Sequence, residues 1–152
     1  MRMGMVRKQN KALTLEIVTA MTEVAEDKWM SAMTETLQEE VESVICFMLI
    51  SFRAGLRGKE TPLTAIGGLL AFWDKTREES DPFVMITLQG RFKGEVDARW
   101  HCIPIADKTR SRIPFRLWLE RMLHRQVNLK GRSACWLFVD KKGGRAKFGA
   151  YD

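Results

Sequence analysis

The chain has 152 residues, of which 45% are hydrophobic and 29% are charged, and its formal net charge is +6. These values are typical of one globular domain that is large enough to bury a core. No apolar run approaches the length of about 18 residues that a membrane helix needs, so the sequence predicts no membrane span. Residues 1–11 are basic but lack the apolar segment and cleavage site of a secretory signal.

The cysteines indicate a reducing compartment. Cys46, Cys102 and Cys135 are far apart, odd in number and in apolar surroundings. We therefore expect reduced core residues of an intracellular protein, nuclear in a eukaryote and otherwise cytoplasmic. No C-x-x-C or paired-histidine spacing occurs, and a zinc site built from His101, Cys102 and a distant ligand is disfavoured. The spacing of these residues therefore predicts no metal site.

Charge is distributed unevenly along the chain. Residues 1–80 hold 10 basic and 12 acidic side chains, a net charge of −2, whereas residues 81–152 hold 15 and 7, a net charge of +8. This asymmetry favours one surface that meets a polyanion such as DNA and another that does not. Ordinary charge that keeps a protein in solution is the alternative interpretation.

The first half of the chain is predicted to be helical. Residues 1–11 read as a disordered basic tail, and residues 12–152 as one domain. Thr14 can cap an amphipathic helix that ends near residues 26–27, with apolar Leu15, Val18, Met21 and Val24. A second helix is expected over residues 31–54. It begins exposed and acidic, ends buried in the core, and stops at Gly55; its acidic residues are Glu35, Glu39, Glu40 and Glu42.

The second half predicts a small sheet and one more helix. Strands are expected over residues 69–73, 83–88 and 98–105, forming a three-stranded antiparallel meander with a glycine turn over residues 90–94. A helix over residues 113–126, a basic loop over 128–133 and short extended pieces over 136–139 and 146–149 follow. The predicted fold class is α+β, mainly helical.

Residues 52–60, F-R-A-G-L-R-G-K-E, place cations at the end of the long second helix. The guanidinium of Arg57 is a planar fork of donors that stays charged and fits the oxygens of a phosphate. Arg53 is a further candidate for contact with DNA. The alternative is a solvated helix end at which Arg57 and Glu60 pair at the helical spacing i, i+3.

A second basic motif, G-R-F-K at residues 90–93, falls in the predicted hairpin. Lys93 beside a glycine turn can project from the edge of the sheet, with Arg91 two residues earlier. An ordinary basic turn is the alternative for this motif alone. Arg99 and Lys108 are further basic residues predicted to contact DNA.

The order of these motifs resembles the catalytic domain of the tyrosine recombinases, the phage-integrase, Xer and Cre-like enzymes. G-L-R-G-K-E at residues 55–60 is similar to the family's motif that closes a buried helix, and Lys93 matches its hairpin lysine. The segments C-I-P-I at residues 102–105 and L-T-L-E at residues 13–16 also resemble family patterns. The likeness covers residues 12–139, and each motif alone is short.

The resemblance implies DNA breaking and rejoining through a covalent phosphotyrosine, without metal or cofactor. Arg57 would hold the non-bridging oxygens of the scissile phosphate, and Glu60 would orient or support it. Lys93 would protonate the leaving 5′ oxygen as a general acid. We therefore expect Arg57 and Lys93 to share one concave surface, with Glu60 beside Arg57. DNA binding is expected to be weak, independent of sequence and steeply dependent on salt.

The chain also departs from the family. No H-x-x-R motif supplies the second arginine, since His124-Arg125 has the wrong spacing and His101 lies in a predicted strand. Tyr151 comes too early to be the nucleophile. We expect a partial catalytic domain, such as a remnant of a mobile element, that does not cut DNA by itself. Its oligomeric state and its target site are not predicted.

Two alternatives remain from the sequence. The first is a small basic module without chemistry that binds nucleic acid or protein, in which Trp100, Trp118 and Trp136 would stack on bases; at helical spacing, Trp118 also fits a core residue. The second is a helical protein-binding fragment that uses the acidic face from Glu35 to Glu42.

Overall fold

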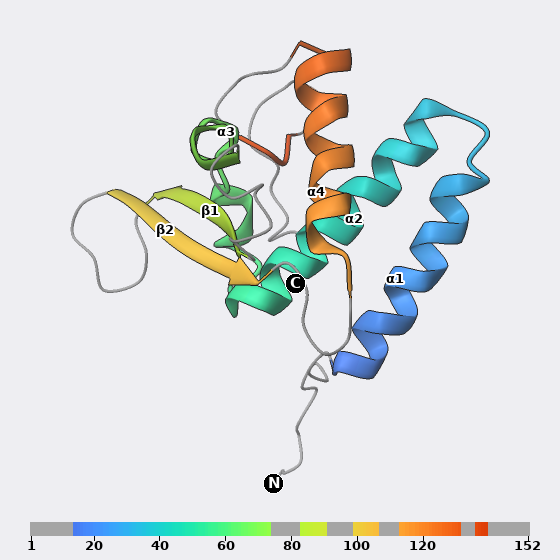
Figure 1. The fold of residues 1–152 in the computed structure, drawn as a ribbon, viewed down its shortest axis with the longest axis horizontal. Coiled ribbons are helices and arrows are strands. Elements are labelled where there is room, and N and C mark those ends of the chain that lie inside the picture. The colour runs from blue at the N-terminus through green and yellow to red at the C-terminus, as the bar shows by residue number, and fades with distance from the viewer. Residues whose placement is uncertain (1–13, 74–82, 91–98, 107–112, 132–135, 140–152) are drawn as a thin grey trace, which may run out of the picture.

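The computed structural model describes residues 14–73, 83–90, 99–106, 113–131 and 136–139. In these ranges the chain is mainly helical with a small two-stranded antiparallel sheet, which is an α+β arrangement (Figure 1). The elements in chain order are α1 (Leu15–Met30), α2 (Glu35–Ala54), the 3-10 turn η1 (Thr61–Leu63), α3 (Ile66–Trp73), β1 (Phe83–Gly90), β2 (Arg99–Ala106), α4 (Phe115–Leu123) and the π-helix η2 (His124–Leu129). None of the helices in these ranges is both long enough and apolar enough to cross a membrane.

Helix α1 begins where the sequence predicts and ends later. The hydroxyl of Thr14 accepts a hydrogen bond from the amide of Ile17, so the predicted N-cap is confirmed. The helix continues past residues 26–27 to Met30. Its last turn is retained because the indole of Trp29 packs against the core and the hydroxyl of Ser31 donates to the carbonyl oxygen of Asp27.

Helix α2 is the central helix, as predicted. It begins at Glu35 rather than at residue 31, because Thr34 is the N-cap and accepts from the amide of Leu37 over 3.2 Å. Its second half is buried, and Figure 1 shows it running between α1 on one side and the sheet on the other. Gly55 ends the helix in the left-handed conformation, which confirms the predicted stop.

The prediction of a strand over residues 69–73 is wrong, because these residues belong to helix α3. A short apolar run carries no polar alternation, so its periodicity does not separate a buried strand from a buried helix. The chain just before α3 takes a place beside the sheet instead. Thr64 forms an isolated bridge with Leu88, and Ala65 forms one with Trp136.

Strands β1 and β2 confirm the other two predicted strands. They pair antiparallel from Phe83 opposite Ala106 to Gly90 opposite Arg99. One face of the sheet enters the core, since Val84, Ile86 and Leu88 of β1 are fully buried. The predicted glycine turn over residues 90–94 extends beyond the described residues.

Helix α4 is shorter than predicted and passes directly into the π-helix η2. The wider turn is seen where the amide of Lys130 donates to the carbonyl oxygen of Arg125 over 3.0 Å. Two residues of the predicted basic loop, Asn128 and Leu129, therefore belong to η2. The piece at residues 136–139 meets the chain before α3, where the amide of Leu137 donates to the carbonyl oxygen of Thr64. The extended piece predicted over residues 146–149 lies outside the described residues.

The cysteines follow the sequence prediction only in part. Cys46 is fully buried in α2 as a free thiol, and burial raises its pKa well above the ordinary value. Cys102 is exposed, so its prediction as a core residue is wrong. It lies on the face of β2 opposite to buried Ile105, because neighbouring residues of a strand alternate between faces. Cys135 lies outside the described residues.

Candidate functional site

The site predicted from the sequence begins at the C-terminal end of α2. Gly55 has a φ of 66°, and the amide of Leu56 donates to the carbonyl oxygen of Ser51 over 3.0 Å. These features end the helix sharply and change the direction of the chain. Arg57 follows two residues later and is exposed.

Glu60 lies beside Arg57 and contacts its backbone. The Oε1 of Glu60 accepts a hydrogen bond from the amide of Arg57 over 2.9 Å, and the amide of Glu60 donates to the carbonyl oxygen of Arg57 over 2.9 Å. The carboxylate therefore closes a tight turn rather than pairing with the guanidinium. Within the part of the chain that the structure describes, no side chain accepts a hydrogen bond from the Arg57 guanidinium.

The turn is fastened to α2 through buried Thr61, which buried Thr64 supports in turn. The hydroxyls of Ser51 and Thr61 lie 2.7 Å apart, and Thr61 is fully buried. The hydroxyl of Thr64 donates to the carbonyl oxygen of Thr61 over 2.8 Å. Because buried hydroxyls that are hydrogen-bonded resist displacement, the backbone that carries Arg57 is held from both ends.

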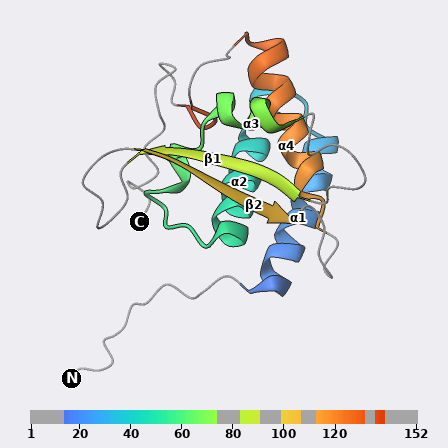
Figure 2. The same ribbon diagram turned by 60° about the vertical axis from the view of Figure 1, so that its left-hand side comes forward.

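The segment after Glu60 also packs against the end of β1. A Cβ atom on Gly90 would lie 2.7 Å from Cδ1 of Leu63, so only glycine fits without a shift of the leucine. Two residues further on, the amide of Ala65 donates to the carbonyl oxygen of Thr87 over 2.8 Å. Figure 2 shows the chain that follows α2 reaching the end of β1. The two basic motifs of the sequence thus start from neighbouring places in the fold.

The remaining predicted site residues are placed only in part. Arg53 is half-buried in the last turn of α2, and Arg99 is the first residue of β2. Arg91, Lys93 and Lys108 lie outside the described residues, so the predicted surface shared by Arg57 and Lys93 stays a prediction.

A buried charge cluster between the helices was not predicted. Glu42 is 1% exposed, so its prediction as an exposed residue is wrong. Its Oε1 accepts from Nε of Arg125 over 2.7 Å, and its Oε2 accepts from Nη2 of Arg125 over 3.0 Å and from the indole of Trp29 over 2.7 Å. Gln38 completes the cluster by accepting from Nη2 of Arg125 over 2.9 Å. The hydrogen bonds from Arg125 to Glu42 raise the pKa of the guanidinium, which therefore stays charged.

This cluster joins α2 to the π-helix η2, and a second pair joins α1 to α4. The two terminal nitrogens of Arg121, Nη1 and Nη2, donate to the carboxylate of Glu26 over 2.5 and 2.9 Å. The same guanidinium lies 3.9 Å from the ring centre of Trp29 and 4.7 Å from that of Trp118. Such pairs hold helices in register; they do not present a free group to a ligand.

The sequence carried a usable signal for this cluster. Glu42 precedes buried Ile45 and Leu49 by three and seven residues, which places it on the same helical stripe. A carboxylate on a buried stripe needs a cation on the facing element. The sequence prediction treated the four glutamates at the start of α2 as one exposed face, and it therefore missed that Glu42 is buried.

Base stacking by aromatic residues does not fit Trp118, which is fully buried in α4, so that part of the nucleic-acid alternative is wrong. Trp136 is half-buried, and the side chain of Trp100 is not described. Within the described ranges, no group of three His, Cys, Asp or Glu side chains could hold a metal ion. In comparisons with known proteins, no family model, no curated protein and no solved structure matches the chain.

Proposed function

We propose that the turn over residues 55–60 binds a phosphate of DNA through Arg57, as the first arginine of a site of the tyrosine-recombinase kind. Lys93 is the second cation of this site and the general acid at the leaving oxygen. Glu60 acts through the backbone, since its carboxylate closes the turn that presents Arg57. The proposed partner is DNA of any sequence, because contacts to phosphate position a protein without reading bases.

The first support is the availability of the Arg57 guanidinium. A guanidinium that already pairs with a carboxylate gains little by binding phosphate, because it must first give up that partner. At this turn the neighbouring carboxylate is used on the backbone amide, and Arg57 is exposed on a turn fastened to α2. An arginine held in this way can meet a phosphate without rearrangement of the chain.

The observation that carries the proposal is the packing of Gly90 on Leu63. Leu63 follows Glu60 by three residues, and Lys93 follows Gly90 by three residues. Three residues of fully extended chain span about 11 Å at most. We therefore infer that Lys93 lies in the region where Arg57 is presented, although thirty-six positions separate the two residues in sequence.

The test measures binding of the full chain to a labelled DNA duplex by fluorescence anisotropy, over a range of salt concentrations. Each lost phosphate contact lowers the slope of log K against log salt by about 1. We expect Arg57→Ala and Lys93→Ala each to lower the slope by this amount. The double variant should lose less than the sum of both in free energy, because two cations on one phosphate are coupled.

Lys28→Ala is the matched control, because it removes the same charge from an exposed position on α1, away from the turn. It should leave the salt slope unchanged. Equal losses in Lys28→Ala and Arg57→Ala would mean that binding follows net charge alone, and the proposal would be wrong. A strong preference among unrelated duplex sequences would also contradict it.

A further inference from the structure

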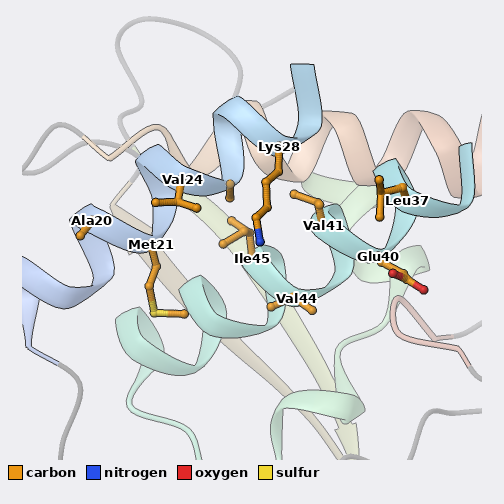
Figure 3. A pocket seen from close by; sticks show the side chains of 10 residues that line it. Ala20, Met21, Val24, Lys28, Leu37, Glu40, Val41, Val44 and Ile45 are labelled. Atoms are coloured by element: carbon orange, nitrogen blue, oxygen red, sulfur yellow. The ribbon is translucent and has the colours of Figure 1, made fainter. Parts of the chain in front are cut away.

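Helices α1 and α2 leave an apolar groove between them on the side away from the core, which we call the α1–α2 groove (Figure 3). It has a volume of about 470 Å³, and its lining residues are Ala20, Met21, Val24, Ala25, Lys28, Leu37, Glu40, Val41, Val44 and Ile45. Figure 3 shows Met21 and Val24 of α1 and Val44 of α2 among the side chains that line it. Val24 is 54% exposed and Val44 is 56% exposed, so the described chain leaves these side chains open to solvent.

The groove exists because α1 carries two apolar stripes rather than one. Val18 and Ala25 face inward and are buried, whereas Met21 and Val24 lie on the neighbouring stripe and are exposed. The predicted single face of Leu15, Val18, Met21 and Val24 is therefore split in the structure. Half-exposed apolar side chains gathered in one groove, rather than scattered singly, are typical of a surface that meets a partner.

Acidic side chains follow the outer edge of the groove. Glu16, Glu23 and Asp27 are exposed and recur on α1 at spacings of seven and four, which places them on one row of the helix. Ala20 links this row to the groove, because it lines the groove and also a shallow hollow beside Glu16 and Glu23. On α2, Glu40 lines the groove directly. Lys28 is the cation among the lining residues and balances Glu40, so the acidic excess around the opening comes from the row on α1.

We propose that the α1–α2 groove binds an amphipathic helix of a partner protein whose apolar face is flanked by lysine or arginine. A helix that lies in a groove between two others buries its apolar stripe in the way that helical peptides are recognised. Its flanking cations meet the acidic row on α1 and Glu40 on α2. A second copy of this chain fits less well, since pairing two such faces brings two acidic rows together.

The test uses a labelled synthetic peptide of about 15 residues in which leucines recur at spacings of three and four between flanking lysines. Its affinity for the full chain is measured by fluorescence anisotropy. A matched peptide carries glutamate at every lysine position. We expect the lysine peptide to bind more tightly by about tenfold or more, and a chain with Glu23→Lys and Asp27→Lys to lose most of this preference.

Two substitutions at exposed positions test the groove itself. Val44→Asp should weaken binding of the lysine peptide by about tenfold, because a charge replaces a side chain that the peptide would bury. The milder Val44→Thr should weaken binding by a smaller factor, because this substitution removes apolar character with little change in the shape of the side chain. Leu129→Asp is the control, since Leu129 is also 56% exposed but lies at the end of η2 and does not line the groove. It should change the affinity by less than about twofold.

Three results would overturn the proposal. Equal binding of the lysine and glutamate peptides would remove the role of the acidic row. Self-association of the chain that Val44→Asp abolishes, measured by sedimentation, would assign the groove to a second copy. Tighter binding of the peptide after Arg7→Glu and Lys8→Glu would assign it to the chain's own basic N-terminal residues.

Discussion

Two arginines in this protein each have a glutamate close by, and they are used in opposite ways. Arg125 is 5% exposed, and its side chain makes two hydrogen bonds to the carboxylate of Glu42. Arg57 is exposed, and the carboxylate of Glu60 accepts from its backbone amide instead. The first pair lies between α2 and η2, and the second lies in the turn where α2 ends.

This difference shows that two opposite charges that are close in sequence or in space do not by themselves make a binding site. Burial forces the Arg125 guanidinium to satisfy its donors within the protein, because an unpaired charge in the interior is very costly. At an exposed turn water satisfies the guanidinium, and the carboxylate is free to stabilise the backbone. The buried arginine therefore contributes to folding, whereas the exposed one remains available to a polyanion.

The largest expected effect is on the buried side of this comparison. Arg125→Ala removes one partner of a buried pair and leaves the Glu42 carboxylate beside the indole of Trp29 without its cation. Such a change costs about 3–5 kcal/mol of unfolding free energy. Arg57→Ala, at an exposed position, should change it by about 0.5 kcal/mol at most. Urea unfolding of both variants measures the two values.

A double substitution is the control for the buried pair. Glu42→Leu combined with Arg125→Met replaces both charges by apolar groups of similar size and should recover most of the loss, because no buried charge is then left alone. If Arg57→Ala destabilises the protein as much as Arg125→Ala does, the distinction between the two arginines fails.

Elements that were predicted well depend on local signals. The N-cap at Thr14 and the stop at Gly55 follow from short-range rules, and the long apolar pattern of α2 is strong enough to predict the central helix. The prediction of a strand over residues 69–73 failed because a short apolar run fits a strand and a helix equally well. Only the packing of α3 on β1 decides between them, and that contact is not local.

For the candidate site, the sequence predicted the place of Arg57 after α2 better than it predicted how that residue is held. Arg57 could be placed from the end of α2, but the bond from its amide to Glu60 depends on the exact turn geometry. Glu42 was misread because its partner Arg125 is 83 positions away, and the register of two packed helices is not encoded in either helix alone. The α1–α2 groove was missed for the same reason.

The second prediction addresses the rigidity of the turn that presents Arg57. Gly55→Ala adds a Cβ that meets nothing within 4 Å, so its cost comes from the φ of 66° alone. Left-handed backbone costs a residue with a side chain about 1–2 kcal/mol. We expect a loss of this size in unfolding free energy, together with weaker binding of DNA if Arg57 contacts phosphate.

Gly67→Ala is the matched control for this change. Gly67 lies in α3, and a Cβ there also meets nothing within 4 Å, but its φ is not in the left-handed region. Alanine in a helix is favoured over glycine by about 0.5–1 kcal/mol. The two glycine variants should therefore shift stability in opposite directions, and a shared sign would contradict the role assigned to Gly55.

The smallest effect concerns Glu26 and Arg121, a pair that lies between the two extremes of the comparison. The hydrogen bonds from Arg121 lower the pKa of Glu26 from its ordinary value of 4.5. The unfolded chain therefore takes up this proton at a higher pH than the folded chain does. The stability that the pair supplies is complete above about pH 4.5 and is lost as the pH falls through the lowered pKa. Because the Glu26 side chain is 39% exposed, solvent limits the contribution to about 1 kcal/mol or less.

A double-mutant cycle of Glu26→Gln and Arg121→Gln, followed by urea unfolding at decreasing pH, isolates this contribution. Arg121 also stacks on Trp29 and Trp118, and that loss occurs with or without Glu26, so it cancels in the cycle. We expect a coupling energy that is constant near neutral pH and declines only below about pH 4.5. Coupling that persists unchanged into strong acid would mean that the carboxylate charge is not what Arg121 recognises. A coupling energy as large as the loss expected for Arg125→Ala would mean that the exposure of a charged pair does not decide its contribution to stability.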